Sequence, residues 1–259
     1  MTKTPVYSRH RSQPYKPGQS ETFKLSRSKI DLFLNCPACF WLDRRLKISR
    51  PEGFPFQINK AVDELLKKEF DTYRLKRKPH PYMVEYKIDA IPYQHENLNT
   101  WRENFVGIQY LHEPTNLLIF GAVDDVWVNP AGELIVVDYK ATSKRTEVTL
   151  DAPWQIGYKR QMEVYQWLLK RNGFEVSDTG YFVYCNGRLD PEGFFNKIEF
   201  NTKVIDYTGN SDWVEPTLEK IKKALESKAM PQRSPECEYC SYAESRVKLF
   251  EQNRVKQQS

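Results

Sequence analysis

The pattern of apolar and polar residues predicts a β-hairpin in the middle of the chain. Two apolar runs rich in β-branched residues, at residues 117–128 and 134–141, are separated by Asn-Pro-Ala-Gly at 129–132. Strand-like runs joined by a short segment of turn residues are typical of a hairpin. The second run is apolar at odd and even positions alike, which indicates a strand covered on both faces of its sheet.

Helical spacing predicts helices before and after this hairpin. Residues 58–75 carry apolar side chains at the spacing of one buried stripe: Ile58, Val62, Leu65, Leu66 and Phe70. Further helices are expected over about 28–46, 153–171 and 212–228, and further strands over 82–88, 179–185 and 195–207. This order predicts an α/β fold in which a mixed central sheet is flanked by helices.

Length and charge narrow the picture only a little. The chain has 259 residues, enough for a domain with a full core, and a formal net charge of +5 that is compatible with a polyanionic partner. Residues 1–22 are basic and rich in Pro and Ser, so they are expected to form a disordered tail. A second basic run covers residues 74–80 and offers another contact for phosphates.

The sequence gives no sign of a membrane partner. No apolar run approaches the roughly 20 residues of a membrane span, and the first residues lack the apolar core of a signal peptide. These observations lead us to expect a cytoplasmic protein in a reducing compartment, where structural disulfides are rare.

The hairpin brings two carboxylates and one lysine to the same face. If its turn is centred on Ala131, paired residue numbers sum to 262, and Asp124 lies opposite Asp138. Lys140 is two residues past Asp138 and shares its face. In this register Asp125 points to the other face, and only a bulge would exchange the two neighbouring aspartates.

This arrangement suggests a metal site. Two opposed carboxylates repel one another, most of all where burial removes their water. A divalent cation such as Mg²⁺ relieves that repulsion and makes a bound water more acidic, while Lys140 is suited to orienting the water or stabilising charge on a phosphate. The alternative is that the three residues form weak ion pairs at an exposed hairpin end.

The motif extends beyond the hairpin and resembles a known family. Gly121-x-x-Asp124 and Asp138-x-Lys140 are followed by Gln161-x-x-x-Tyr165 on the next helix, and residues 24–42 match an opening Leu-Ser/Cys-Pro pattern. Together these are similar to the signature of RecB-type PD-(D/E)XK nucleases. That group includes the nuclease domains of RecB and AddB and CRISPR-associated RecB-like exonucleases.

The resemblance carries several implications. It implies a restriction-endonuclease-like core over residues 23–245, a short flexible or helical tail over 246–259, and Mg²⁺ or Mn²⁺ bound by Asp124 and Asp138. It implies hydrolysis of DNA with single-stranded character, exonucleolytic rather than endonucleolytic, in repair, recombination or defence. In the family, the Gln161 and Tyr165 positions support the metal site or contact DNA.

One position departs from the family pattern. A histidine often precedes the sheet beside the metal, and the matching position here is Asn59. An amide is a poorer metal ligand than an imidazole, so Asp63 or Glu85 is expected to help. This departure keeps open an alternative function, a nucleic-acid-binding module with a nuclease-like fold and weak or no catalysis.

The cysteines suggest a second metal centre. Four of the five form two Cys-x-x-Cys pairs about 200 residues apart: Cys36, Cys39, Cys237 and Cys240. Paired spacing of this kind is usual for zinc, whereas the resemblance implies a 4Fe-4S cluster closing the domain. A zinc protein unrelated to nucleases is a third reading. Cys185, in a predicted strand, is expected to be a buried apolar residue.

Overall fold

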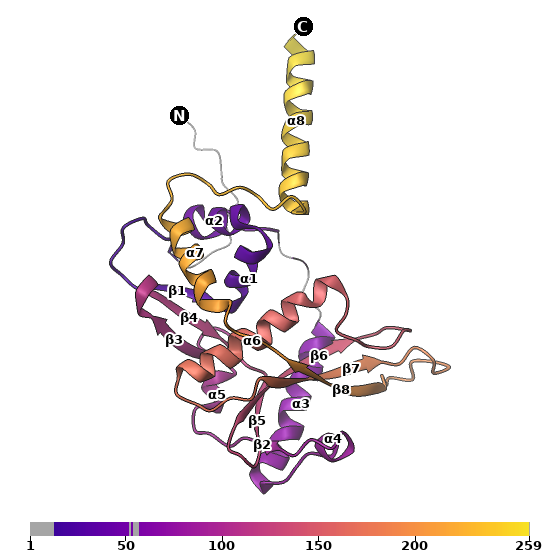
Figure 1. The fold of residues 1–259 in the computed structure, drawn as a ribbon. Coiled ribbons are helices and arrows are strands. Elements are labelled where there is room, and N and C mark those ends of the chain that lie inside the picture. Colours follow the sequence, from indigo (N-terminus) through magenta and orange to yellow (C-terminus); the bar gives the residue numbers. More distant parts are fainter. Residues whose placement is uncertain (1–12, 52, 54–56, 259) are drawn as a thin grey trace. The chain divides into compact units, whose positions relative to one another are not determined.

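A computed structural model describes residues 13–51, 53 and 57–258 (Figure 1). The chain divides into two compact units. Unit 1 combines the two ends of the chain, residues 1–53 and 215–259, with residues 113–117. Unit 2 is formed by residues 54–112 and 118–214. The hairpin carboxylates therefore belong to unit 2, and the two cysteine pairs belong to unit 1.

The described residues of unit 2 contain a mixed five-stranded sheet. Its order is β2-β5-β6-β7-β8, with β6 and β7 parallel and the other neighbours antiparallel. The strands are β2 (Ile91–Pro92), β5 (Asp125–Val128), β6 (Leu134–Thr142), β7 (Thr179–Gly187) and β8 (Phe200–Thr208). The parallel pair needs a crossover, which α6 (Ile156–Arg171) provides. The predicted α/β class with a mixed sheet flanked by helices is confirmed.

Helices α3 (Gln57–Lys76) and α6 cover opposite faces of this sheet (Figure 1). Side chains alternate along β6, so Val137 and Tyr139 pack with α3, while Asp138 faces α6. Gly180 in β7 allows α6 to approach closely, because a Cβ there would lie 2.4 Å from the sulfur of Met162. The sheet core therefore surrounds β6, the strand that carries the candidate site.

The apolar run 117–128 is two strands, which corrects the prediction of one. β4 (Leu117–Gly121) neighbours β3 (Ile108–His112) in another sheet, whereas β5 joins the five-stranded sheet. Between β4 and β5 the backbone leaves the ladders, and the Val123 amide bonds the Trp101 carbonyl at the end of α5 (Leu98–Trp101). Asp124 is the last residue of this link and therefore lies outside both strands.

Two local predictions in unit 2 were wrong. Residues 82–88, expected as a strand, begin with α4 (Pro81–Glu85), since Pro81 suits the first helical position and His80 accepts a hydrogen bond from the Tyr82 amide. The buried stripe of α3 is also narrower than expected, because Ile58 and Leu65 are more than half exposed.

Unit 1 is built mainly from helices. They are α1 (Arg27–Asn35), α2 (Pro37–Leu46), α7 (Val214–Glu226) and α8 (Glu238–Gln258). Unit 1 also holds the short strand β1 (Phe23–Ser26) and the 3-10 helix η1 (Glu113–Thr115). A second 3-10 helix, η2 (Pro153–Gln155), belongs to unit 2. Residues 246–259, which were expected to form a flexible or helical tail, are helical as far as Gln258. No described helix is both long and apolar enough to span a membrane.

The start of the chain is ordered earlier than predicted. Residues 1–12 of the expected disordered tail lie outside the described residues. Tyr15 is buried and donates a hydrogen bond to Glu226, and the Gly18 amide donates to the same carboxylate over 2.7 Å. An aromatic side chain that finds a buried site and a polar partner is held in place, so the chain is anchored to unit 1 at Tyr15 and Gly18, within the expected tail.

Candidate active site and cysteine centre

The hairpin has the predicted register. Asp125 pairs with Val137 and Val128 pairs with Leu134, so paired numbers sum to 262. Asp124 lies one residue before β5, just outside the β5–β6 ladder. Its Oδ2 accepts a hydrogen bond from the Tyr139 amide of β6 over 2.9 Å. At this position the side chain of Asp124, rather than the backbone of β5, accepts a hydrogen bond from β6.

Asp138 is held on the α6 face of the sheet. Its side chain is fully buried, and its Oδ1 accepts a hydrogen bond from Gln161 Nε2 over 2.7 Å. The other oxygen forms an ion pair with Lys140. Gln161 also donates to the Tyr165 hydroxyl over 3.2 Å, one helical turn further along α6. The structure thus brings four of the predicted site residues into one connected group.

The charge of Lys140 ties Asp124 to the same group. Burial alone would lower the pKa of Lys140, but the carboxylates of Asp138 and Asp124 outweigh it and raise that pKa. The ammonium is therefore protonated at neutral pH. A permanent cation at this position is suited to stabilising negative charge and cannot serve as a general base.

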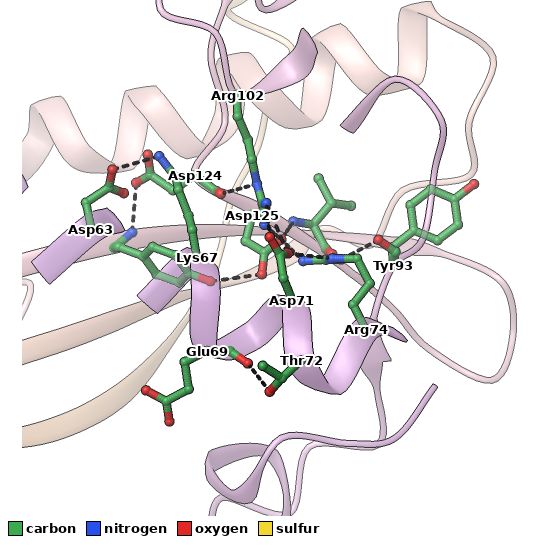
Figure 2. Close-up of polar contacts among 12 residues, drawn as sticks. Asp63, Lys67, Glu69, Asp71, Thr72, Arg74, Tyr93, Arg102, Asp124 and Asp125 are labelled. Carbon is green, nitrogen blue, oxygen red and sulfur yellow. Dashed lines mark hydrogen bonds and ion pairs between the residues drawn. The ribbon is translucent and has the colours of Figure 1, made fainter. Parts of the chain in front are cut away.

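Helix α3 contributes a third carboxylate, Asp63. Figure 2 shows Asp63 and Asp124 together beside the ammonium of Lys67, which forms an ion pair with Asp63 over 2.7 Å. Burial raises the pKa of Asp63, and the charge of Asp124 raises it further, while Lys67 opposes both. Of the two helpers expected from the sequence, Asp63 lies at the site, whereas Glu85 is exposed at the end of α4.

A small cavity of about 220 Å³ opens beside these groups. Asn59 and Asp63 from α3, Lys140 from β6 and Tyr158 from α6 line it. Asn59, at the position where the family often has a histidine, therefore lines the same cavity as Lys140. A larger groove of about 1020 Å³ shares Asn59 and Tyr158 with this cavity, so the two are adjacent.

Asp125 belongs to a buried ion-pair network that the sequence analysis missed. Its Oδ1 accepts hydrogen bonds from Arg74 Nη2 at 2.5 Å and Arg102 Nη2 at 2.9 Å, and its Oδ2 accepts one from the Tyr139 hydroxyl at 2.8 Å. Asp71 completes the network by pairing with both arginines (Figure 2). The predicted orientation of Asp125, away from Asp138, agrees with these contacts.

This network fixes the helix and the hairpin relative to one another. Burial raises the pKa of Asp71, but the two arginines outweigh it and lower that pKa. Burial and the charge of Asp125 raise the pKa of Tyr139 well above its usual range, so its hydroxyl remains a donor. Arg102 also donates to the Asp124 carbonyl over 3.1 Å. The arginines therefore hold the backbone that presents Asp124.

The sequence contained only a weak signal for this network. Arg74 belongs to the basic run that was expected to contact phosphates, although its helical position one turn after the buried Phe70 places it at the edge of the α3 core face. Arg102 lies in a segment with no clear periodicity. The one available hint was that Asp125, the second of two consecutive aspartates, needed a partner of its own.

The residues of this site suit a divalent metal. Asp124 and Asp138, with Asp63 nearby, offer the hard carboxylate oxygens that Mg²⁺ and Mn²⁺ prefer. Lys140 and Lys67 already offset part of the negative charge. The donor set therefore fits the metal that the family implies.

In unit 1 the four paired cysteines come together. Their sulfur atoms all lie within 4.8 Å of one another, and all four are free thiols: Cys36, Cys39, Cys237 and Cys240. Burial raises the pKa of Cys36, but hydrogen bonds from the Cys39 and Ser234 amides and from neighbouring thiols outweigh it and lower that pKa to about 6. The four thiols are therefore close enough to bind a metal, and the spacing of the two pairs predicted that they would come together.

The fifth cysteine stands apart from this cluster. Cys185 lies in β7 of unit 2, is buried as predicted, and has one polar neighbour in the Thr202 hydroxyl at 3.5 Å. Burial raises the pKa of its thiol. It therefore behaves as a small apolar residue of the sheet core.

Comparison with known proteins identifies the family to which these features belong. The profile described as the PD-(D/E)XK nuclease superfamily matches residues 57–245. Among solved structures, one titled "Crystal structure of SSO0001" is similar with a TM-score of 0.40 and 16% identity, covering 87% of this chain and 86% of that one. No curated protein matches the chain.

Proposed function

Because the chain belongs to the PD-(D/E)XK nuclease superfamily, we propose that it is a nuclease that hydrolyses DNA phosphodiester bonds with Mg²⁺ or Mn²⁺. The observation that carries this proposal is the convergence of Asp124, Asp138 and Lys140 at the end of one hairpin. A bound divalent ion would supply an acidified water and neutralise charge on the phosphate.

Each residue of the group has a defined task in this proposal. Asp124 and Asp138 hold the metal, and Asp63 adds an oxygen ligand from α3. Lys140, kept protonated by the carboxylates, stabilises negative charge that develops on the phosphate. Gln161 orients Asp138 by its hydrogen bond and is itself held near Tyr165, so these two are positioning residues.

The groove beside the cavity supports a substrate with single-stranded character. It is lined by aromatic rings, including Trp154, Tyr158, Phe194 and Phe195, of which Phe195 is 84% exposed. Lys144 lies 5.2 Å from the centre of the Trp154 ring. Aromatic platforms with adjacent cations bind unpaired bases by stacking, whereas paired bases keep their faces hidden in the duplex.

The same residues support a finer proposal. The Gln161–Tyr165 pair on the helix after the hairpin supports placement in the RecB-type group, together with the cysteine pairs at the two ends of the folded region. An exonuclease acting on DNA in repair, recombination or defence is the activity that we propose within this group.

The test is cleavage of end-labelled single- and double-stranded DNA with Mg²⁺ or Mn²⁺. Asp138→Asn should lower the rate by about 100-fold or more while DNA binding is kept, because a neutral amide holds the cation much more weakly than a carboxylate. The matched control is Asp178→Asn, which removes an exposed carboxylate in the same unit. Equal activity of Asp138→Asn and the wild type would refute the site. Ladders that shorten from one end would indicate an exonuclease.

A second function is favoured by one observation, the amide of Asn59 at the cavity wall. A site with a weaker ligand there would bind nucleic acid without cutting it. DNA binding that needs no metal, with no cleavage under any divalent cation, is the result that would select this function.

A further inference from the structure

The four thiols of unit 1 are as close as the ligands of one metal ion. Cys39 Sγ is 3.6 Å from Cys237 Sγ and 3.5 Å from Cys240 Sγ, and Cys36 Sγ is 3.9 Å from Cys240 Sγ. A tetrahedral ion with metal–sulfur bonds of about 2.3 Å separates its sulfur ligands by about 3.8 Å. These three separations are close to the edge of that tetrahedron, and the remaining ones are no longer than 4.8 Å.

A 4Fe-4S cluster needs a wider arrangement. Each cysteine then binds a different iron, and the iron–sulfide core lies between the ligands, which keeps the cysteine sulfurs roughly 6 Å apart. All four sulfur atoms here lie within 4.8 Å of one another. The cysteine set therefore does not fit the cluster that the family resemblance implied.

We propose that Cys36, Cys39, Cys237 and Cys240 bind a single Zn²⁺. Zn²⁺ accepts four thiolates in tetrahedral geometry, and a closed four-thiolate shell is typical of structural rather than catalytic zinc. The two pairs each lie at the start of a helix, with Cys36 and Cys39 at α2 and Cys237 and Cys240 at α8. The positive ends of both helix dipoles favour the thiolate form.

Arg50 has a defined part in this centre. Four thiolates and one Zn²⁺ leave a net charge of −2, which is costly where the sulfurs are buried. The Arg50 guanidinium donates to Cys237 Sγ over 3.3 Å and lies 4.6 Å from the centre of the Tyr239 ring. These two contacts hold a positive charge against the sulfur shell, so Arg50 should slow the loss of zinc.

The ion would also join two segments of unit 1 that are far apart in sequence. Cys36 and Cys240 are 204 residues apart in sequence. A metal that binds the folded chain only, and joins segments so distant, contributes its binding free energy to folding. The role of the centre is therefore structural and is independent of the carboxylate site.

The first experiment identifies the metal in protein purified without oxygen and without added metal. We expect one zinc per chain, no iron, no acid-labile sulfide and a colourless sample. A mercurial thiol reagent should release one zinc as four thiols react, which tests the site without any substitution. About four irons and four sulfides per chain, with brown colour, would overturn the proposal and leave the nuclease proposal standing.

Variants then assign the ligands and Arg50. Cys39→Ser should lose the zinc, whereas Cys185→Ser, which alters the buried cysteine of unit 2, should retain it. Arg50→Gln should keep one zinc but transfer it to a chromophoric chelator several times faster than the wild type. Lys228→Gln, an exposed unit 1 lysine, is the matched control. Equal transfer rates for Arg50→Gln and this control would refute the role of Arg50.

Discussion

The carboxylate site of unit 2 and the thiol site of unit 1 solve one electrostatic problem in opposite ways. In unit 1, like groups surround one point, and their sulfur atoms lie within 4.8 Å of one another. In unit 2 the carboxylates are distributed over α3, β6 and the link before β5, and lysines of the chain are interleaved with them. The thiol set is complete by itself, whereas the carboxylate set is open.

The difference shows how ligand chemistry and function are matched. A closed shell of soft ligands leaves no coordination position for a substrate, and it suits a permanent structural ion. Hard oxygen ligands with open positions suit Mg²⁺, which keeps waters and exchanges them. Lys140 and Lys67 lower the repulsion that remains when the divalent ion departs. The following four predictions test this separation of roles.

The largest effect is expected from Asp125→Asn. The substitution leaves Arg74 and Arg102 without the buried carboxylate that both contact, and breaking such a buried pair costs about 3–5 kcal/mol. Denaturant unfolding should show this loss, while the zinc content is unchanged. Asp206→Asn, at an exposed position of β8, is the control and should unfold like the wild type. A loss below about 1 kcal/mol would contradict the structural role of the network.

Next in size is the effect of Lys140→Ala on the chemical step. Removing the cation should lower the cleavage rate about 10²–10³-fold, as is usual when a preorganised charge-stabilising group is lost. Single-turnover rates at saturating Mg²⁺ measure it, and DNA affinity and zinc content should stay constant. Lys170→Ala, an exposed lysine of the same unit, serves for comparison. A change confined to KM would show that Lys140 only binds substrate.

A smaller effect, in the direction of gain, is expected from Asn59→His. An imidazole at the cavity wall offers the metal a better ligand than an amide, so metal affinity should rise about tenfold. The midpoint of a Mn²⁺ titration of the cleavage rate gives the value. Gln57→His places the same residue at an exposed position near the start of α3. If both variants behave like the wild type, Asn59 does not face the metal.

The smallest effect is expected on stability from Asp63→Asn. The pKa of Asp63 is raised in the folded protein by burial and Asp124, so its carboxylate opposes folding above that pKa. The amide should raise stability by about 0.5–1 kcal/mol at neutral pH, and the gain should disappear as the pH falls through the raised pKa toward its usual value. Metal affinity should fall. A loss of stability at neutral pH would contradict this assignment.

The hairpin could be predicted because its strands are regular and are joined by a short turn. Alternation with period two fixes which side chains share a face, and the turn at residues 129–132 fixes the register. Asp124, Asp138 and Lys140 followed from those two facts. The helix of Gln161 and Tyr165 followed from its apolar spacing, although the hydrogen bond from Gln161 to Asp138 required the structure.

Other features depend on interactions that no local pattern encodes. The run 117–128 is apolar throughout, so nothing in it shows that β4 and β5 join different sheets. Arg74 and Arg102 reach Asp125 from sites 51 and 23 residues away. Ile58 and Leu65 have helical spacing but lie beyond the edge of the surface that α3 buries. The distance between thiols, which separates zinc from a cluster, is likewise a property of the folded chain.

The strand switch between β4 and β5 has a consequence for how this sequence tolerates changes in length. Residues 122–124 join strands of two sheets, and the last of them is a candidate metal ligand, so an insertion or deletion there would shift Asp124 out of its position against Tyr139. The connection from residue 188 to 199 ends in two strands of a single sheet and carries exposed side chains. Variation in length among related chains should therefore accumulate in the second connection and be absent from the first.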